Sequence, residues 1–436
     1  MRLAILLAGL SVCNLLLQFV QMVLTITQLG PGTETDALYA GMVVPQFMLV
    51  VIGGSLSQVL VPLLAAEKPG DRDHDAWGFL SITTVFLFLG AALLALLAPF
   101  WVPVLFPGFS HQTRELTIKL TRIQLVGMVL NTSVSVTWSV CQAKRRFFYA
   151  EGSLVIAAVV ATVFLFFALP RSGVQAAAWV PAITAAVQTL ILFPVMGRPR
   201  SPRWNSPAIN EAGRRLKPLL LGTTYYKTDP LIDRLLASMG TPGGLSLFHI
   251  SQQMYGAGNQ VLNKAIAVPM VPQLAELAVL RSWRSFAAVY RARLGAVTAL
   301  AMAGYLIVLL LGERILRVLI GHGGVTFDNV KTLWWILVML GGFLVGGAMG
   351  QVLSSAFYAR GDTATPTRIG MIGFTIGIVL KVLGFLQAGI QGLAFGATLY
   401  LLLNAGLMFR SMELRLRDAN LHEPTGSRAA SPAEPQ

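Results

Sequence analysis

Polar side chains recur inside segments of this chain that are otherwise apolar. Asn14, Gln18 and Gln21 are four and then three residues apart, which places them on one face of a helix. A longer stripe is formed by Gln252, Gln253, Gly256, Asn259, Gln260, Asn263 and Lys264. Polar groups at bilayer depth are expensive unless they face water or a partner. The stripes predict a water-filled space between helices, although a single amide could instead hydrogen-bond a neighbouring helix, which contributes about 2 kcal/mol at most.

Charged side chains occur in two further apolar segments. Asp229 and Asp233 are four residues apart and have Lys227 and Arg234 as neighbours, while Lys381 stands alone in a later segment. One interpretation is that either aspartate carries a coupling H⁺ or Na⁺. The other is a fixed ion pair between these acids and Lys227 or Arg234. Because Lys381 lies midway along its segment, we expect it to face the same internal space.

The segments that hold these residues have the composition of membrane helices. The mean hydropathy is +0.67, and 12% of the residues are charged, where soluble domains have about 25%. A membrane-spanning helix needs roughly 20 apolar residues. We therefore predict an all-α polytopic membrane protein with twelve spans, at residues 4–28, 37–65, 77–105, 116–142, 152–170, 174–196, 217–239, 245–275, 293–311, 332–358, 366–387 and 389–409.

The basic residues predict the orientation of these spans. With the N-terminus inside, 22 of the 33 Lys and Arg residues fall at the inner ends and loops, and seven fall outside. Inner loops of membrane proteins carry this excess. We expect a multi-pass protein with both termini in the cytoplasm. The net charge of +14 follows from this distribution, so a nucleic-acid partner is not expected.

Two patterns recur and indicate an internal duplication. "DALYAGMVVPQ" (from Asp36) parallels "LSLFHISQQMY" (from Leu245), and "CQAKRRFFYA" (from Cys141) parallels "FYARGDTATP" (from Phe357). The offset covers an even number of helices, so the repeats are parallel, with a pseudo-two-fold axis along the membrane normal. We predict a six-helix bundle at 1–197, a basic cytoplasmic linker at 198–216, a second six-helix bundle at 217–410 and a disordered cytoplasmic tail at 411–436.

Motifs for catalysis are not found in the sequence. It has no nucleotide-binding glycine motif after a strand, no H-E-x-x-H metal motif and no G-x-S-x-G nucleophile elbow. Cys13 and Cys141 have the spacing of neither a metal site nor a disulfide framework. We expect a protein that is not an enzyme and that has no metal or organic cofactor.

Several motifs resemble the MurJ/MviN family. They are "LGPGTETDALYAGMVVPQ", "SQVLVPLLAAE", "SSAFYARGDTATPTRIG" and "GIQGLAFGATLYLLLNAGLM". The resemblance is collinear over nearly the whole chain. It implies a flippase of lipid-linked peptidoglycan precursor in the bacterial inner membrane. It also implies the fold of the MOP superfamily, which includes flippases for other polysaccharides and the MATE drug exporters.

The resemblance also bears on individual residues. Family members carry cavity arginines that are thought to contact the pyrophosphate. The matching positions here hold Gln21, Gln252 and Gln253, and the paired arginines of the second span fall near Met48 and Leu49. The acidic residue of the "TDA" turn is kept as Asp36. The substrate is accordingly lipid II or another undecaprenyl-linked glycan.

Together these observations predict the functional residues. Lys227, Lys264 or Lys381 would meet the pyrophosphate, and Asp229 or Asp233 would couple an ion if the membrane potential is not the energy source. The predicted substrate-binding set is Gln18, Gln21, Asp36, Lys227, Gln252, Gln253, Asn259, Asn263, Lys264 and Lys381. Two alternatives stay open: a MATE-like ion-coupled exporter of small amphiphiles, and a non-transporting scaffold that recruits glycan-synthesis enzymes.

Overall fold

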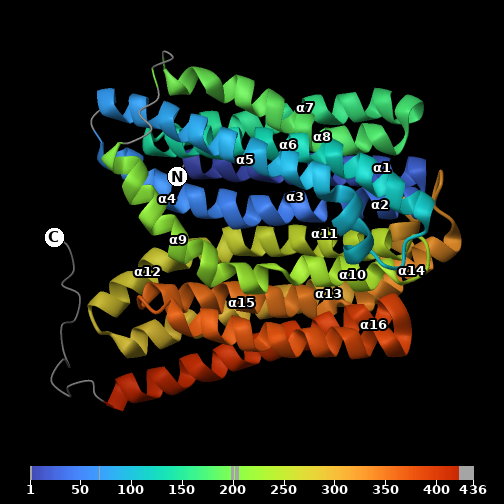
Figure 1. Cartoon of the computed structure of the whole chain (residues 1–436). Helices are drawn as coiled ribbons and strands as arrows, with labels where there is room; N and C mark the ends of the chain where they lie inside the picture. The colour runs from blue at the N-terminus through green and yellow to red at the C-terminus, as the bar shows by residue number, and fades with distance from the viewer. Residues whose placement is uncertain (1, 68, 198–200, 202–205, 422–436) are drawn as a thin grey trace.

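The computed structural model describes the chain except for residues 1, 68, 198–200, 202–205 and 422–436. All regular elements in the described residues are helices that run along one common direction (Figure 1). The first half contains α1 (Arg2–Leu29), α2 (Thr33–Gly41), α3 (Val43–Met48), the π-helix η1 (Leu49–Gly53), α4 (Gly54–Ala66), α5 (Pro69–Leu105), α6 (His111–Ala143), α7 (Phe147–Ser172), α8 (Val174–Leu192) and the 3-10 helix η2 (Phe193–Met196). The second half contains α9 (Pro207–Lys227), α10 (Asp229–Ser238), α11 (Gly244–Leu262), the π-helix η3 (Asn263–Ala267), α12 (Val268–Val279), α13 (Trp283–Ile320), α14 (Phe327–Met339), α15 (Gly341–Ala359) and α16 (Ala364–Leu421).

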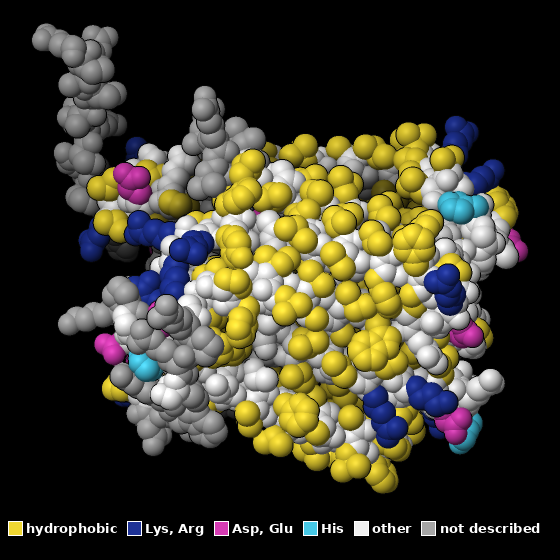
Figure 2. All heavy atoms as spheres, turned by 90° about the horizontal axis from the view of Figure 1, so that it is seen from above, with side chains coloured by type: hydrophobic (Ala, Val, Ile, Leu, Met, Phe, Trp, Pro, Cys, Tyr) yellow, Lys and Arg dark blue, Asp and Glu magenta, His cyan; other side chains and the backbone are white. Residues whose placement is uncertain are grey.

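The helices have the lengths and composition of membrane spans. In the described residues, nine helical stretches are long and apolar enough to cross a bilayer. One of them, Ala364–Asp418, contains two spans because Ala388 and Gly389 have non-helical backbone angles. The predicted spans 217–239 and 245–275 are helical but are not among the nine, because they hold the densest polar residues. Figure 2 shows the resulting apolar belt, with charged side chains gathered at its two ends.

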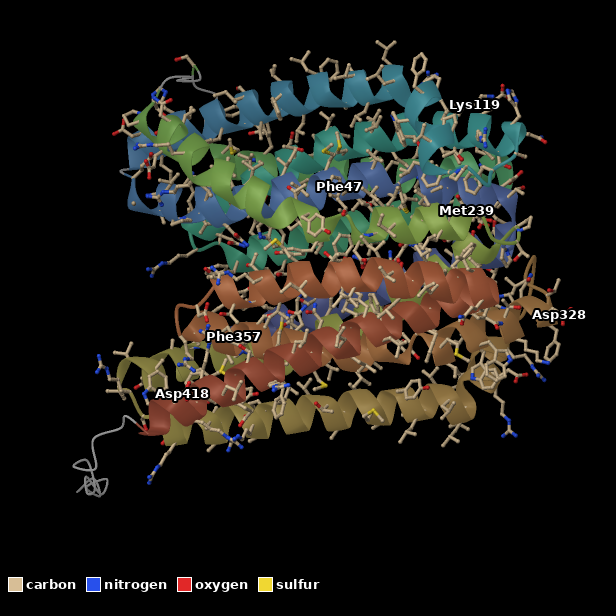
Figure 3. All side chains as sticks on the ribbon, turned by 60° about the horizontal axis from the view of Figure 1, so that its bottom comes forward. Phe47, Lys119, Met239, Asp328, Phe357 and Asp418 are labelled. Atoms are coloured by element: carbon tan, nitrogen blue, oxygen red, sulfur yellow. The ribbon has the colours of Figure 1, made fainter. Side chains whose placement is uncertain are left out.

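The two ends of the bundle differ in the turns and loops that connect the helices. The basic end joins successive helices through turns at Lys144–Arg146, Arg281 and Arg360. The latch end has the loops at residues 30–32, 239–243 and 321–326. α1 begins and α16 ends toward the basic end (Figure 1). In Figure 3, Phe357 and Asp418 mark the basic end, while Lys119, Met239 and Asp328 mark the latch end.

The predicted duplication is visible in two turns of the basic end. The Arg146 amide donates to the Cys141 carbonyl at 2.8 Å, and the Asp362 amide donates to the Phe357 carbonyl at 3.0 Å. These are the long hydrogen bonds of the Schellman motif, which requires a residue with positive φ. Gly361 supplies that residue in the second half with φ 75°, and Arg145 supplies it in the first half with φ 57°.

The segment predicted as a linker becomes helical earlier than expected. α9 begins at Pro207, where the Ser206 hydroxyl accepts a hydrogen bond from the Ile209 amide at 3.2 Å. Ala212 of α9 is buried in a cluster with Leu60 and Leu64 of α4. Apolar residues at helical spacing, overlooked among the basic ones, give α9 a face that packs against the first half.

The tail also differs from the prediction of disorder from residue 411. α16 continues to Leu421, and its last turns are held by ion pairs to α13 and to the turn between α15 and α16. Arg291 donates to both oxygens of Glu413, at 3.1 and 2.6 Å, and Arg415 pairs with Asp362. These pairs extend the helix beyond the apolar span. Residues 422–436 lie outside the described residues.

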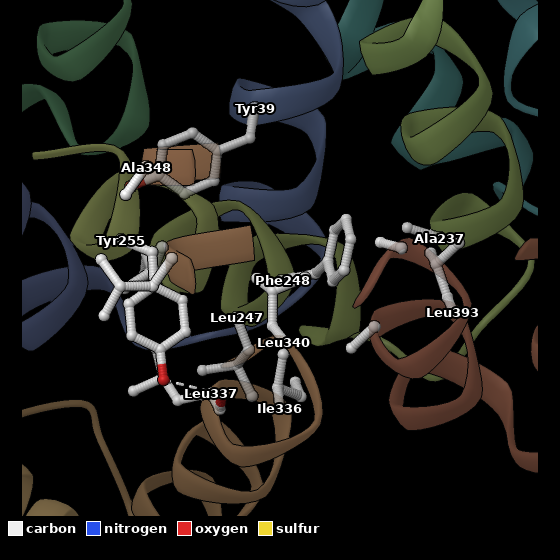
Figure 4. Packing of buried hydrophobic residues seen from close by; sticks show 14 of the residues in the cluster. Tyr39, Ala237, Leu247, Phe248, Tyr255, Ile336, Leu337, Leu340, Ala348 and Leu393 are labelled. Carbon is white, nitrogen blue, oxygen red and sulfur yellow. Dashed lines mark hydrogen bonds between the residues drawn. The ribbon is translucent and has the colours of Figure 1, made fainter. Parts of the chain in front are cut away.

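Near the latch end the two halves share one apolar core. Tyr39 of α2 and Phe248 of α11 belong to the same buried cluster, although they come from different halves. Tyr255 of α11 donates its hydroxyl hydrogen bond to the Leu337 carbonyl at 2.9 Å (Figure 4). This core anchors α11 inside the second half while its first turns contact α2 of the first half.

Candidate functional site

Asp36 ties the two halves together at the latch end. One carboxylate oxygen accepts from the Gly243 amide at 2.7 Å, and the other accepts from the Ser246 amide at 2.8 Å and the Ser246 hydroxyl at 2.5 Å. Gly243, the N-cap of α11, has no side chain to satisfy these amides. Asp36, a residue of the other half, is therefore the cap of α11. It is 4% exposed, so the structure places it in this latch and not on a cavity wall.

Loop backbones seal the latch end around this cap. The Gly324 amide donates to the Thr27 carbonyl at 2.6 Å. A Cβ on Gly30, which has φ +72°, would lie 2.5 Å from the Gly324 carbonyl oxygen. Such close approach between backbones of the two halves is open only to glycine. The bundle is therefore closed at this end.

A cavity of about 450 Å³ lies below the latch, between the first half and α11. Its described lining contains no Lys, Arg, Asp or Glu side chain. The polar groups that line it are mainly amides and hydroxyls, from Asn14, Gln18, Gln21, Thr25, Tyr39, Gln46, Asn131, Thr184, His249, Gln253 and Gln260. Such groups both donate and accept hydrogen bonds without adding charge.

Three residues of the predicted set line this cavity. Gln21 donates to the Ala158 carbonyl at 3.1 Å and to the Thr162 hydroxyl at 3.0 Å, so its amide nitrogen is already engaged by α7. Gln18 and Gln253 present exposed side chains to the cavity. The predicted stripe on α1 therefore meets part of the predicted stripe on α11, at Gln253 and Gln260.

Sequence reasoning missed other lining residues. Tyr39 and Gln46 of the second span both face the cavity, as does Asn131 of α6. Tyr39, Met42 and Gln46 have the spacing of one helical face, a signal that was present but was weaker than the amide stripes.

Asn259 and Gln252 have other partners. Asn259 donates to the Phe343 carbonyl of α15 at 2.9 Å, which makes it a contact within the second half. Gln252 donates to Asp233 at 2.7 Å. Asn263 lies in η3 and does not belong to the described cavity lining. Adjacent positions on α11 thus separate into cavity-facing and core-facing side chains.

A largely buried ion cluster lies within the second half, between α10 and α16. The Lys381 ammonium of α16 lies 2.6 Å from a carboxylate oxygen of Asp229 and 2.7 Å from one of Asp233. The Lys381 side chain is 1% exposed and that of Asp233 is 2% exposed. The i, i+4 spacing on α10 aims both carboxylates at one ammonium. The sequence predicted Lys381 as a cation of the cavity. The structure instead pairs it with the two acids of α10.

The cluster reaches the cavity through hydrogen bonds. Arg234 donates to the Gln252 side-chain oxygen at 3.2 Å and also bonds the Nδ1 atom of His249. The His249 ring contacts the Tyr39 ring at a tilt of 35°, with 4.3 Å between centroids, and both rings line the cavity. Arg234 thereby joins the acids of α10 to the cavity wall.

Lys264 and Lys227 both lie beside π-helical turns. Lys264 belongs to η3, and its ammonium donates to the Ser11 hydroxyl of α1 at 2.9 Å. Lys227 donates to the Val50 carbonyl in η1 at 3.2 Å. Within the described part of the chain, neither lysine has a carboxylate partner. Since Lys264 follows the cavity-lining Gln260 by one turn, it stands at the rim that faces the basic end.

Known proteins share both the sequence pattern and the fold. A sequence profile described as "Lipid II flippase MurJ" matches residues 26–429. A probable lipid II flippase MurJ of Vibrio cholerae is 24% identical, over 94% of this chain and 82% of its own length. The lipid II flippase MurJ of Burkholderia cenocepacia is 23% identical, over 91% of this chain and 80% of its own length.

Solved structures confirm the predicted fold class. A lipid II flippase MurJ in an inward closed conformation superposes with a TM-score of 0.82 at 17% identity, covering 96% of this chain and 90% of that one. An inward-facing MATE family transporter of the MOP superfamily gives a TM-score of 0.79 at 15% identity, covering 96% of this chain and 99% of that one. The chain therefore has the two-bundle architecture of that superfamily.

Proposed function

The chain belongs to the MurJ family of lipid II flippases, and from that premise we propose that it moves a polyprenyl-pyrophosphate-linked glycan across the bilayer by alternating access. The headgroup enters between the two halves from the basic end while the latch end is closed. The halves then rock to open the latch end. The polyprenyl chain stays in the surrounding lipid. The chain carries out no covalent chemistry in this cycle.

The observation that carries this proposal is the uncharged, amide-lined cavity below a sealed latch. Gln18 comes from the first half and Gln253 from the second, and both line the cavity. Each side-chain amide offers hydrogen-bond donors and an acceptor. Sugar hydroxyls need that combination, because each hydroxyl donates one hydrogen bond and accepts others. A glycan headgroup therefore fits the lining better than a charged solute.

Lys264 supplies the cation for the pyrophosphate at the cavity rim. Its side chain is exposed, and the Ser11 hydroxyl leaves ammonium hydrogens free for phosphate oxygens. Lys227 is a second candidate cation for the pyrophosphate, and it contacts the first half at the Val50 carbonyl. An ammonium acts as a point charge and lacks the bidentate geometry of arginine. This arrangement suits a family member whose cavity has glutamines at the positions that match the arginines of its relatives.

The charge distribution supports an orientation and an energy source. The basic end faces the cytoplasm, with both termini inside, because inner loops carry the excess of Lys and Arg. Moving an anionic headgroup outward is then favoured by about 2.3 kcal/mol per charge for each 100 mV of inside-negative potential. The membrane potential is the energy source that these features favour. The same basic surface could hold glycan-synthesis enzymes that deliver the lipid.

The test is transport by the purified full chain in vesicles. A fluorescent polyprenyl-pyrophosphate disaccharide is placed in the leaflet that contacts the basic end, with and without an imposed potential. We expect movement that a potential of the stated sign accelerates, and we expect Lys264→Gln to slow it about tenfold. Lys331→Gln is the matched control, because Lys331 is an exposed lysine at the latch end.

Each outcome of this assay decides between the candidate functions. No movement of any lipid-linked glycan would remove the flippase. Full activity of the wild type together with full activity of Lys264→Gln would remove the role of that lysine. The alternative of a MATE-like ion-coupled exporter of small amphiphiles has less support, since the described cavity lining has no carboxylate that could bind a coupling ion or a cationic solute. A scaffold would tolerate Lys264→Gln in cells and show no movement in vesicles.

A further inference from the structure

The ion cluster of the second half contains its own cation. Lys381 contacts both carboxylates of α10, at 2.6 and 2.7 Å, and its ammonium also lies 5.3 Å from the centre of the Tyr400 ring. An alkali ion bound between Asp229 and Asp233 would have to occupy the space that the ammonium holds. A proton on either carboxylate would cancel one of the two charges that Lys381 pairs with. The residues present therefore do not fit an exchangeable coupling ion.

The charges of the cluster support the same conclusion. Asp229 and Asp233 carry two negative charges, and Lys381 and Arg234 carry two positive charges. All four side chains pack in one connected group of hydrogen bonds and ion pairs that also includes Gln252. An additional cation would add an unpaired positive charge beside the buried side chains of Lys381, Asp233 and Arg234, and an uncompensated buried charge is strongly unfavourable.

The backbone around Lys381 holds the ammonium in place. α16 folds back on itself at residues 388–389, and its two arms touch through glycines. A Cβ on Gly396 would lie 2.8 Å from the Cα of Lys381, and a Cβ on Gly377 would lie 2.7 Å from the Tyr400 ring. These contacts fix the backbone of Lys381, and the two ion pairs then hold its ammonium against α10.

We propose that Lys381 is a tethered counter-ion, which takes the place of an exchangeable Na⁺ or H⁺ at the Asp229–Asp233 pair. The second half consequently neither binds nor releases a cation during the cycle. For transport this inference rests on the proposed function, whereas for cation binding it stands on the cluster alone. Removing the ammonium is expected to uncover a cation site made of two carboxylates, the buried Asp233 and the partly exposed Asp229.

The decisive experiment measures thermal unfolding of the purified full chain in NaCl, LiCl, KCl and N-methylglucamine chloride at equal ionic strength. The wild type should show Tm differences below about 1 °C among these salts. Lys381→Met should gain about 3 °C or more from one small cation or from acidification, because a ligand that binds only the folded state raises the Tm. Asp229→Asn combined with Lys381→Met is the matched control and should lose that response.

Two results would overturn the inference. One is a cation-specific Tm rise in the wild type, which would show that an ion binds despite Lys381. The other is a Lys381→Met protein that is insensitive to every cation and to pH. If Lys381→Met does not fold, Lys381→Gln in the presence of propylammonium replaces it, and rescue by this untethered ammonium is expected. A failure of lipid transport in vesicles would leave these readouts unchanged, so the two proposals fail separately.

Discussion

The two halves of this molecule arise from one repeated pattern, yet they use buried polar residues in opposite ways. The first half, together with α11, surrounds a cavity of about 450 Å³ whose described lining has no Lys, Arg, Asp or Glu side chain. The second half has a cluster of four charged side chains in which Lys381 joins Asp229 and Asp233. The polar groups of the cavity have open space beside them. The carboxylates of the cluster have the Lys381 ammonium between them.

The difference follows from what each group tolerates. A buried charge must keep all of its partners, because a single lost partner leaves an uncompensated charge. An amide such as Gln18 can exchange water for a sugar hydroxyl at small net change in free energy. A substrate can therefore enter the first half without disturbing the fold. The second half is suited to stay rigid and to hold α10 and α16 against each other.

The largest expected effect comes from breaking the charged cluster. Asp233→Asn should lower the free energy of unfolding by about 3–5 kcal/mol, since it leaves Lys381 and Arg234 with one carboxylate between them. The measurement is Tm and denaturant unfolding in detergent. Gln18→Leu in the cavity is the control and should change stability by less than about 0.5 kcal/mol. Similar losses for both variants would refute the contrast between the halves.

The contact between the halves should give the next largest effect. Asp36→Asn removes the charge that caps α11 and should favour opening of the latch end by about 1–3 kcal/mol. Spin labels at Lys119→Cys and Asp328→Cys, with Cys13 and Cys141 replaced, report the separation of the halves there. For Asp36→Asn we expect an additional, longer component in the distance distribution between the two labels. For Ser246→Ala we expect the same component at a smaller population. An unchanged distance distribution would show that the latch does not hold this end.

Cavity amides should affect transport without affecting stability. Gln18→Leu and Gln253→Leu each remove hydrogen bonds to the headgroup worth about 1 kcal/mol, which predicts roughly threefold to tenfold slower movement of the lipid. Flux in vesicles and Tm in detergent are measured on the same preparations. Gln391→Leu at the exposed latch-end surface is the control. A fall in Tm that matches the fall in flux would instead assign these amides to helix packing.

The duplicated turns allow a smaller test of the repeat. Arg145→Gly should stabilise the first half by about 0.5–1 kcal/mol, because glycine adopts the positive φ of 57° without a Cβ clash. Gly361→Ala should destabilise the second half by a similar amount. Opposite shifts in Tm are expected, and shifts of equal sign would show that the two turns are not equivalent.

The smallest effect concerns Glu67 at the basic end of the first half. Burial and the neighbouring Asp75 carboxyl raise the pKa of Glu67 from 4.5 to about 7. The folded protein thus binds this proton more tightly than the unfolded chain does. Its contribution to stability is complete below pH 4.5 and is lost as the pH rises through about 7. Glu67→Gln should flatten the dependence of Tm on pH in that window, and an unaltered slope would contradict this assignment.

The sequence predicted the twelve spans, the duplication and two walls of the cavity, since hydropathy and helical periodicity are local properties. Gln18 and Gln253 were found because amides stand out in apolar segments. The hydrogen-bond and ion-pair partners of the buried charged residues were not predicted, because these partners are distant in the chain. Lys381 and Asp229 are 152 residues apart, and Asp36 and Ser246 are 210 residues apart. Periodicity places a residue on a face of a helix but does not determine which helix it meets.

The cap that Asp36 of the first half forms on α11 also affects the ratio of closed to open molecules. When the latch opens, water reaches the Asp36 carboxylate and the Gly243 and Ser246 amides together, so each lost bond is replaced by a solvated one. The net difference is then about 1–3 kcal/mol, not the full desolvation of a buried carboxylate. By itself this cap biases the population toward closed molecules by a factor of about 5 to 150. A substrate that prefers the open state by a similar factor would offset the contribution of the cap and draw the cycle forward.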